Sequence, residues 1–129
     1  MIITDTLSNF FSKIKNGYLA KKNKTTQHKS KQIIKILNIF LKEGIIKSYT
    51  FDKKNQNIIN IYFKYKNNQP VICQIKRISK PSKRVYIKNK DLFKINKKGL
   101  FLLSSSYGII TDLEAKKINT GGELICNIY

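Results

Sequence analysis

Hydrophobic residues recur at helical spacing near the start of the chain. The spacing predicts an amphipathic helix from about Asp5 to Asn16, where Gly17 could end it. Its apolar stripe consists of Leu7, Phe10, Phe11 and Ile14. A polar stretch follows, with a weak strand expected around Lys24 to Gln27. A stronger stripe of isoleucine, leucine and phenylalanine then predicts a second helix from Ser30 to Gly44.

The pattern then changes to that of strands. Ile45 to Phe51 and Ile58 to Lys66 are rich in β-branched and aromatic residues, and the polar segment Asp52 to Asn57 separates them, as in a hairpin. The polar stretch Asn67 to Pro70 follows and is the best candidate for a domain boundary, because proline disfavours helix in the residue before it.

The rest of the chain is mainly strand-like. The expected strands are Val71 to Ile78, Arg84 to Ile87, Gly99 to Leu103 and Leu124 to Ile128. A brief helix should start at Thr111 or Asp112, with Glu114 near its positive end, and run to about Ile118. The chain is thus expected to be an α+β protein. Residues 1–68 would form a helix-strand-helix-hairpin α/β domain, and residues 69–129 a mainly antiparallel β domain with one short helix.

Charge narrows the choice of partner. The 129 residues contain 26 lysines and arginines against seven acids, for a formal net charge of +19. Internal pairing cannot absorb this excess, so much of it should face a polyanion. Nucleic acid is favoured over membrane, because no apolar run approaches the roughly 20 residues of a spanning helix and the lysines are not gathered on one amphipathic helix. Only Arg77 and Arg84 are arginines, which leaves 24 lysines that bind phosphate as point charges with little base reading.

The sequence gives little indication of metal binding or redox chemistry. Cys73 and Cys126 are far apart and no Cys-x-x-Cys spacing occurs, so no zinc site, disulfide framework or cofactor is expected. The residues from Met1 onward lead directly into a helical pattern without a secretory or transit signal, and we expect the protein to act where it is made.

Two segments are candidates for contact with nucleic acid. Arg77 to Tyr86 packs cations and hydroxyls around a turn, where Lys80, Lys83 and Arg84 could clamp phosphates. Tyr86 could either stack on a base or lie in the core. The second segment runs from Ser104 to Gly108. Its hydroxyls could enter the shallow minor groove of A-form RNA, although the tripeptide alone would also suit an ordinary polar hairpin tip.

The flanks of the serine segment favour the first interpretation. Ser104-Ser105-Ser106-Tyr107-Gly108, followed by Ile109 to Asp112 and then Gly121-Gly122-Glu123-Leu124-Ile125-Cys126, closely resembles the C-terminal signature of the bacterial-type small-subunit ribosomal protein eight family. The resemblance covers essentially the whole chain. In the family the middle hydroxyl is usually threonine, which is Ser105 here. The glycine often found after Pro81 is Ser82, a proline expected near Phe93 is absent, and the loop before Gly99 is one residue short.

The resemblance implies a structural protein of the small ribosomal subunit. Such a protein would bind the central domain of small-subunit rRNA through both of its domains, support rRNA folding and assembly in translation, and contact neighbouring ribosomal proteins. Carried over by position, the serines would reach an irregular RNA helix, Gly108 would shape the turn, and Tyr86 would lie near that surface. Gly121, Gly122 and Glu123 would orient the loop. The backbone contacts of the first domain would come from Lys13, Lys15, Asn16, Lys29 and Lys31.

Two rival functions remain open at this point. A general RNA-binding chaperone outside the ribosome would bind RNA without preference. A small ribonuclease using His28 lacks a positioned partner residue, so no catalytic residue, small-molecule substrate or enzymatic activity is expected. The enrichment in lysine, isoleucine and asparagine favours an organellar ribosome, mitochondrial before plastid, with the cytoplasm of an AT-rich bacterium as the alternative.

Overall fold

The structure combines helices with antiparallel sheets in two compact units. It is a computed structural model that describes residues 6–72, 74–80, 82–94 and 99–129. The contacts of these residues divide them into a unit that begins at Thr6 and a unit that begins at Gln74, a few residues after the expected start at residue 69. The predicted α+β class is confirmed.

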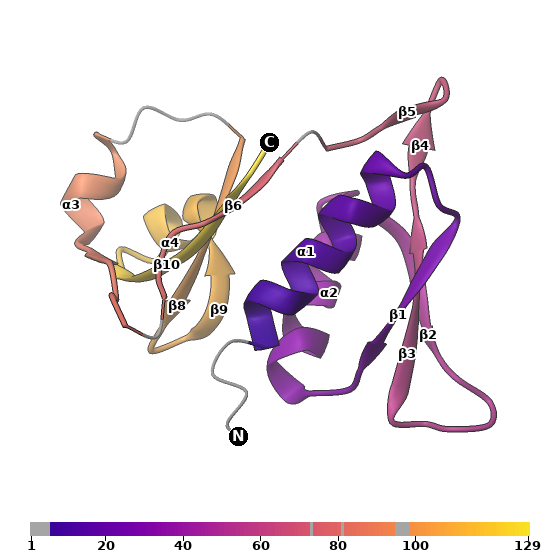
Figure 1. The fold of residues 1–129 in the computed structure, drawn as a ribbon. Helices are drawn as coiled ribbons and strands as arrows, with labels where there is room; N and C mark the ends of the chain where they lie inside the picture. The colour runs from indigo at the N-terminus through magenta and orange to yellow at the C-terminus, as the bar shows by residue number, and fades with distance from the viewer. Residues whose placement is uncertain (1–5, 73, 81, 95–98) are drawn as a thin grey trace. The chain divides into compact units, whose positions relative to one another are not determined.

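The N-terminal unit has the expected order of helix, strand, helix and hairpin. Its elements are α1 (Thr6–Leu19), β1 (Lys24–His28), α2 (Lys31–Lys42), β2 (Ile46–Phe51) and β3 (Ile58–Phe63). The three strands form an antiparallel sheet in the order β1-β3-β2, and both helices lie on the same face of it (Figure 1). The other face of this sheet carries no helix of its own unit.

The apolar stripes that predicted the two helices form the core of this unit. Phe10 of α1 and Phe40 of α2 are fully buried, with ring centroids 6.1 Å apart. Beneath them Ile59 and Ile61 of β3 are also fully buried. Because side chains alternate along a strand, the residues between them point to the opposite face.

The first helix is longer than predicted. Its expected end at Asn16-Gly17 is wrong, since α1 continues to Leu19. Gly17 serves a packing role: a Cβ at this position would lie 2.2 Å from Cζ of Phe63, whose ring is itself buried against Tyr18. The glycine allows a close approach of helix and sheet, which the periodicity of the sequence could not reveal.

The segment proposed as a boundary forms a small hairpin. β4 (Tyr65–Lys66) pairs with β5 (Gln69–Pro70), and the turn is made by Asn67 and Asn68, with φ values of 53° and 63°. The predicted strand Ile58 to Lys66 is therefore interrupted at Lys64, whose backbone N–H donates to the Tyr18 hydroxyl. The strand expected over Val71 to Ile78 is present only as β6 (Ile75–Arg77), and Cys73 lies outside the described residues.

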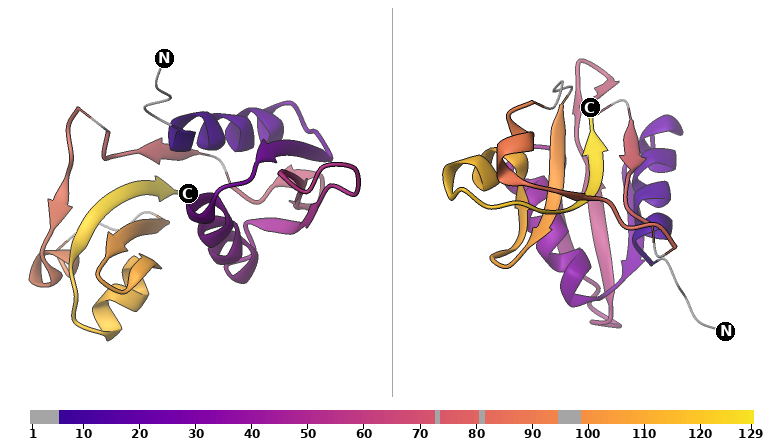
Figure 2. Two further views of the ribbon diagram at one scale, coloured as in Figure 1. Left: turned by 90° about the horizontal axis from the view of Figure 1, so that it is seen from below. Right: turned by 90° about the vertical axis from the view of Figure 1, so that its left-hand side faces the viewer.

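The C-terminal unit is built around its last strand. It contains β6, β7 (Tyr86–Ile87), α3 (Asn89–Leu92), β8 (Leu100–Ser105), β9 (Gly108–Thr111), α4 (Asp112–Lys117) and β10 (Gly122–Ile128). Strand β10 pairs antiparallel with β6, β7 and β8, and β8 pairs with β9. Figure 2 shows β10 as a long, curved strand. The sequence pattern missed α3 and β9, which span only four residues each.

One layer of apolar side chains holds the helices of this unit to the sheet. The buried cluster comprises Leu92, Phe101, Leu103, Ile110, Ala115 and Leu124. Thr111 caps α4, its hydroxyl accepting the Glu114 N–H at 3.2 Å, and Glu114 lies in the first turn as expected. Among the described residues no helix is both long and apolar enough to cross a membrane.

Burial of Tyr18 predicts a loss of stability in alkali. Removal of its hydroxyl from water raises the pKa of Tyr18 from 10.0 to about 12, and the hydroxyl donates to the Ile45 carbonyl. Between these two pH values the unfolded chain releases the proton and the folded chain keeps it, so the free energy of unfolding falls as pH rises. We expect a loss of about 2 to 3 kcal/mol for two pKa units, measured by urea unfolding.

Tyr18→Phe provides the control for this prediction. The variant should lack this part of the pH dependence, while all other ionisable groups are the same in both proteins. The same slope in wild type and variant would contradict the assignment to Tyr18.

Candidate nucleic-acid interface

The three serines lie where β8 turns into β9. Ser105 is paired with Gly108, so Ser106 and Tyr107 form a two-residue tip. The Ser105 hydroxyl donates to the Gly108 carbonyl at 3.0 Å and accepts the Tyr107 N–H at 3.1 Å. Ser105 thus uses its hydroxyl to hold the turn together, and its one donor is already engaged.

The other two serines have free hydroxyls. Within the described chain, the side chains of Ser104 and Ser106 make no hydrogen bond, Ser104 being partly buried and Ser106 exposed. Tyr107 beside them is 68% exposed. The sequence had suggested three equivalent hydroxyls, whereas the fold leaves Ser104 and Ser106 to face a ligand and adds the Tyr107 ring.

Glycines shape this hairpin in two different ways. Gly108 has a φ of +97°, and a Cβ built there would meet nothing within 4 Å, so glycine is favoured here by the backbone conformation and not by lack of space. Gly122 acts through space, because a Cβ there would lie 2.4 Å from the Ser104 carbonyl oxygen. Gly121 is equally close to the Ile87 carbonyl oxygen, at 2.3 Å.

Strand pairing brings the predicted partners of the serines into one row. Tyr86 is opposite Glu123, Glu123 is opposite Ser104, and Ser104 is opposite Ile109. Directly opposed residues of antiparallel strands point to the same face. The row therefore crosses four strands on one face of the sheet and ends at the serine hairpin.

Tyr86 is 71% exposed in this row. The alternative that placed Tyr86 in the core is therefore wrong. Its ring and hydroxyl are open to a ligand on the same face as Ser104.

Glu123 is paired with a cation. Its Oε2 lies 3.0 Å from Nη1 of Arg84, with the Glu123 side chain 16% exposed and the arginine 53% exposed. An ion pair this exposed contributes little to stability, of order 0 to 1 kcal/mol. Its main consequence is local: the carboxylate beside Ser104 is neutralised, so it repels an approaching phosphate less. Arg84 engages this carboxylate and is not simply a free phosphate clamp.

The basic turn is anchored to the same strand. Ser79 is 1% exposed, and its hydroxyl accepts the Val85 N–H at 2.9 Å. The backbones of Lys80 and Lys83 bond to each other across the turn, and both residues are exposed. Leu124 of β10 bonds to Ser79 and to Val85 through the backbone. Sequence reasoning gave no role to Ser79, which holds the two ends of the turn together.

The candidates of the N-terminal unit lie around α1, β1 and the start of α2. Nζ of Lys13 donates to the Thr26 carbonyl at 3.1 Å, and Nζ of Lys29 lies 5.4 Å from the centroid of the Phe51 ring. Lys31 is the first residue of α2, whose first turn contains no acid. Lys15 is partly buried, and Asn16 and Lys31 are exposed. Cations at the positive end of a helix favour an anionic partner there.

Little in the described residues suggests chemistry. They contain no group of three or more histidine, cysteine, aspartate and glutamate residues able to hold a metal ion. His28 is exposed at the end of β1. Burial strongly raises the pKa of the Cys126 thiol, which disfavours the reactive thiolate.

Comparison with known proteins shows the family of this chain. The family described as Ribosomal protein S8 matches residues 5–129. The chain belongs to this family. Small ribosomal subunit protein uS8 of Ehrlichia chaffeensis is 41% identical over 132 residues, covering all of both chains. The corresponding Buchnera aphidicola protein is 36% identical, with 99% of each chain covered. Protein uS8c of Chlorella vulgaris is 33% identical over 99% of this chain and all of its own.

Membership of the S8 family confirms the resemblance noted in the sequence. The family consists of structural constituents of the small ribosomal subunit, so the expectation of a protein without enzymatic activity is confirmed, and the ribonuclease alternative is wrong. The relatives are bacterial and chloroplast proteins, and they do not support the preference for a mitochondrial origin.

The two glycines of this S8 family member should respond differently to substitution. Gly108→Asn should cost less than about 1 kcal/mol of unfolding free energy, because asparagine tolerates a positive φ and the space is open. Gly122→Ala should cost about 1 to 3 kcal/mol, since its Cβ would meet a backbone carbonyl. Denaturant unfolding measures both. A larger loss for Gly108→Asn would contradict these roles.

Proposed function

We propose that this chain binds the central domain of small-subunit rRNA and supports its folding and assembly. The observation that carries the proposal is the row of Tyr86, Glu123 and Ser104, together with the exposed tip of Ser106 and Tyr107 in the hairpin that follows Ser104. It combines an aromatic ring, free hydroxyls and a neutralised carboxylate on one face of a protein with a net charge of +19.

Affinity and fit come from different residues in this proposal. Lysines attract the phosphate backbone without reading bases. The hairpin supplies the fit, because short hydroxyls can meet the 2′-hydroxyls and base edges in the shallow minor groove of RNA. An irregular helix would admit the tip best, as its grooves depart from the regular A form.

The proposed contacts divide between the two units. The hairpin, Tyr86 and the basic turn would bind through the C-terminal unit. In the N-terminal unit, the proposed phosphate contacts are Lys13, Lys15, Asn16, Lys29 and Lys31. Arg84, Gly121, Gly122 and Glu123 would orient the serine hairpin. No cofactor or small-molecule substrate enters this function.

The proposed setting is a bacterial or organellar ribosome. The bacterial and chloroplast relatives support this range, and mitochondrial origin stays a prediction from composition alone. Neighbouring small-subunit proteins would be further partners.

Salt should weaken binding to a central-domain rRNA fragment steeply. If Lys13, Lys15, Lys29, Lys31, Lys80 and Lys83 each neutralise one phosphate, log K should fall against log salt with a slope of at least about 4. Replacing Lys80 and Lys83 by glutamine should lower the slope by roughly 1.5. Filter binding over a range of KCl concentrations measures both.

The matched control replaces Lys90 and Lys117 by glutamine, two exposed lysines of the same unit. These changes should leave the slope nearly unchanged. An affinity that does not change with salt would contradict the assignment. An equal decrease of the slope in the two double variants would contradict it as well.

Substitutions at Ser105 and Ser106 should lower RNA affinity for different reasons. Ser106→Ala should weaken binding by of order 1 kcal/mol, since it removes a hydroxyl that faces the RNA. Ser105→Ala should lose a similar amount through the shape of the turn, and Ser105→Thr should retain affinity because it keeps the hydroxyl.

Competition with unrelated duplex RNA is the control for specificity. Losses of equal size on the rRNA fragment and on unrelated RNA would favour the general RNA chaperone. Loss of affinity in Ser105→Thr as large as in Ser105→Ala would contradict the structural role of this hydroxyl.

A further inference from the structure

The sheet of the N-terminal unit has a face that no helix of the unit covers. Ile59 and Ile61 of β3 are buried under the helices, so Asn60 and Tyr62 point to the open side. Register extends this face to the neighbouring strands. Lys24, Tyr62 and Ser48 form one row, and Thr26, Asn60 and Thr50 form the next. None of these residues was assigned a function from the sequence.

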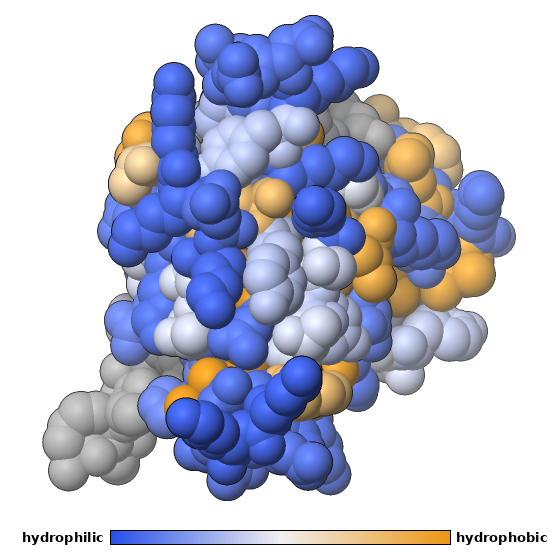
Figure 3. Space-filling view, turned by 90° about the vertical axis from the view of Figure 1, so that its right-hand side faces the viewer, coloured by the Kyte–Doolittle hydropathy of each residue, from blue (hydrophilic) through white to orange (hydrophobic). Residues whose placement is uncertain are grey.

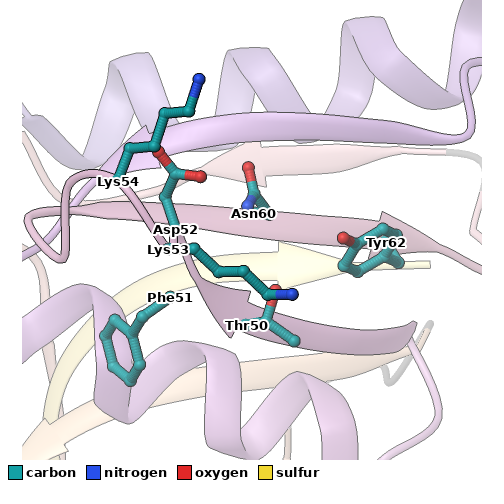
Figure 4. A pocket seen from close by; sticks show the side chains of 7 residues that line it. All are labelled: Thr50, Phe51, Asp52, Lys53, Lys54, Asn60 and Tyr62. Carbon is teal, nitrogen blue, oxygen red and sulfur yellow. The ribbon is translucent and has the colours of Figure 1, made fainter.

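The open face contains a hollow of about 490 Å³. It is lined by Thr50, Phe51, Asp52, Lys53, Lys54, Asn60 and Tyr62 (Figure 4). Ligand pockets of small molecules occupy about 300 to 1,000 Å³, a range that includes this hollow. The Tyr62 ring lies at one end, and the lysines of the β2-β3 turn extend from the other.

Three polar side chains that line the hollow are available to bond to a ligand. Within the described residues, the hydroxyl of Thr50, the amide of Asn60 and the hydroxyl of Tyr62 make no side-chain hydrogen bond. Asn60 offers both donors and acceptors, as base edges do. Tyr62 is partly exposed and offers a ring face as well.

The charged residues around the hollow favour nucleic acid over protein as the partner of this face. Lys53 and Lys54 line the hollow and Lys24 lies beside Tyr62, against the single acid Asp52. Figure 3 shows pale side chains of intermediate hydropathy on this side, bordered by many strongly hydrophilic side chains and by smaller hydrophobic areas. Protein interfaces are depleted of lysine and enriched in apolar residues at their centre, which this face does not match. Cations around an aromatic ring are typical of surfaces that bind unpaired nucleotides.

We propose that the open face of the β1-β3-β2 sheet binds a short unpaired segment of RNA. A base stacks on Tyr62 and bonds to Asn60, and the flanking phosphates meet Lys53 and Lys54. The inference rests on the proposed function only for the kind of partner, since this face lies in the N-terminal unit and the serine hairpin in the other.

Binding of a short, fluorescently labelled single-stranded oligoribonucleotide to the full chain tests the proposal. Replacing Lys53 and Lys54 together by glutamine should weaken binding at least about fivefold, and Tyr62→Leu by a similar factor. The matched control replaces Lys35 and Lys42 by glutamine, two exposed lysines of α2 in the same unit, and should change affinity less than about twofold. Circular dichroism checks the fold of each variant, and the lysine pair decides the test if Tyr62→Leu does not fold.

Each contrary result has a distinct meaning. Equal losses in both lysine pairs would reduce the effect to general attraction and overturn the site, as would unchanged affinity in the Lys53 and Lys54 variant. Loss of a copurifying small-subunit protein in that variant, with unchanged oligonucleotide affinity, would assign the face to a protein and also overturn the proposal. Failure of the proposed rRNA function would appear separately, as loss of preference for the central-domain fragment in wild type.

Discussion

The close approach of β10 to the backbone of β8 is the constraint on which the candidate interface depends. The Ser104 carbonyl leaves no room for a Cβ at Gly122, and the Ile87 carbonyl leaves none at Gly121. These contacts allow one strand to pair with β6, β7 and β8 together. Tyr86, Glu123 and Ser104 then share a row because they are neighbours across β10 and not because they are near in sequence.

The hydroxyls of the hairpin divide the work between shape and recognition. Ser105 turns its hydroxyl inward to Gly108, which links the two ends of the turn. Ser104 and the exposed Ser106 can then meet a ligand at a lower cost in conformational entropy. The Arg84 ion pair completes the arrangement, since an unpaired Glu123 carboxylate beside Ser104 would repel phosphate.

The two units differ in the surface that each combines with its exposed lysines. Both hold lysines at exposed positions, which gives attraction without sequence preference. The C-terminal unit adds a rigid hairpin to this charge, whereas the N-terminal unit leaves a polar sheet face open beside lysines. If both surfaces contact RNA as proposed, specificity would come from their combination, since each surface would have to meet its own feature of the RNA.

Periodicity and charge were enough to predict the α+β class, both long helices and a polyanionic partner, because these depend on local patterns and on composition. The serine signature was also legible, and with its flanks it identified the family. Only the tertiary structure decided that α1 continues past Gly17, that Tyr86 is outside the core, and that Ser105 serves the turn. The packing of Gly17 against the Phe63 ring and the pairing of Tyr86 with Glu123 join residues distant in sequence. The hydrogen bond of Ser105 to the Gly108 carbonyl is local, but it depends on the geometry of the turn. Pairing across strands is non-local, and a pattern read along the chain does not contain it.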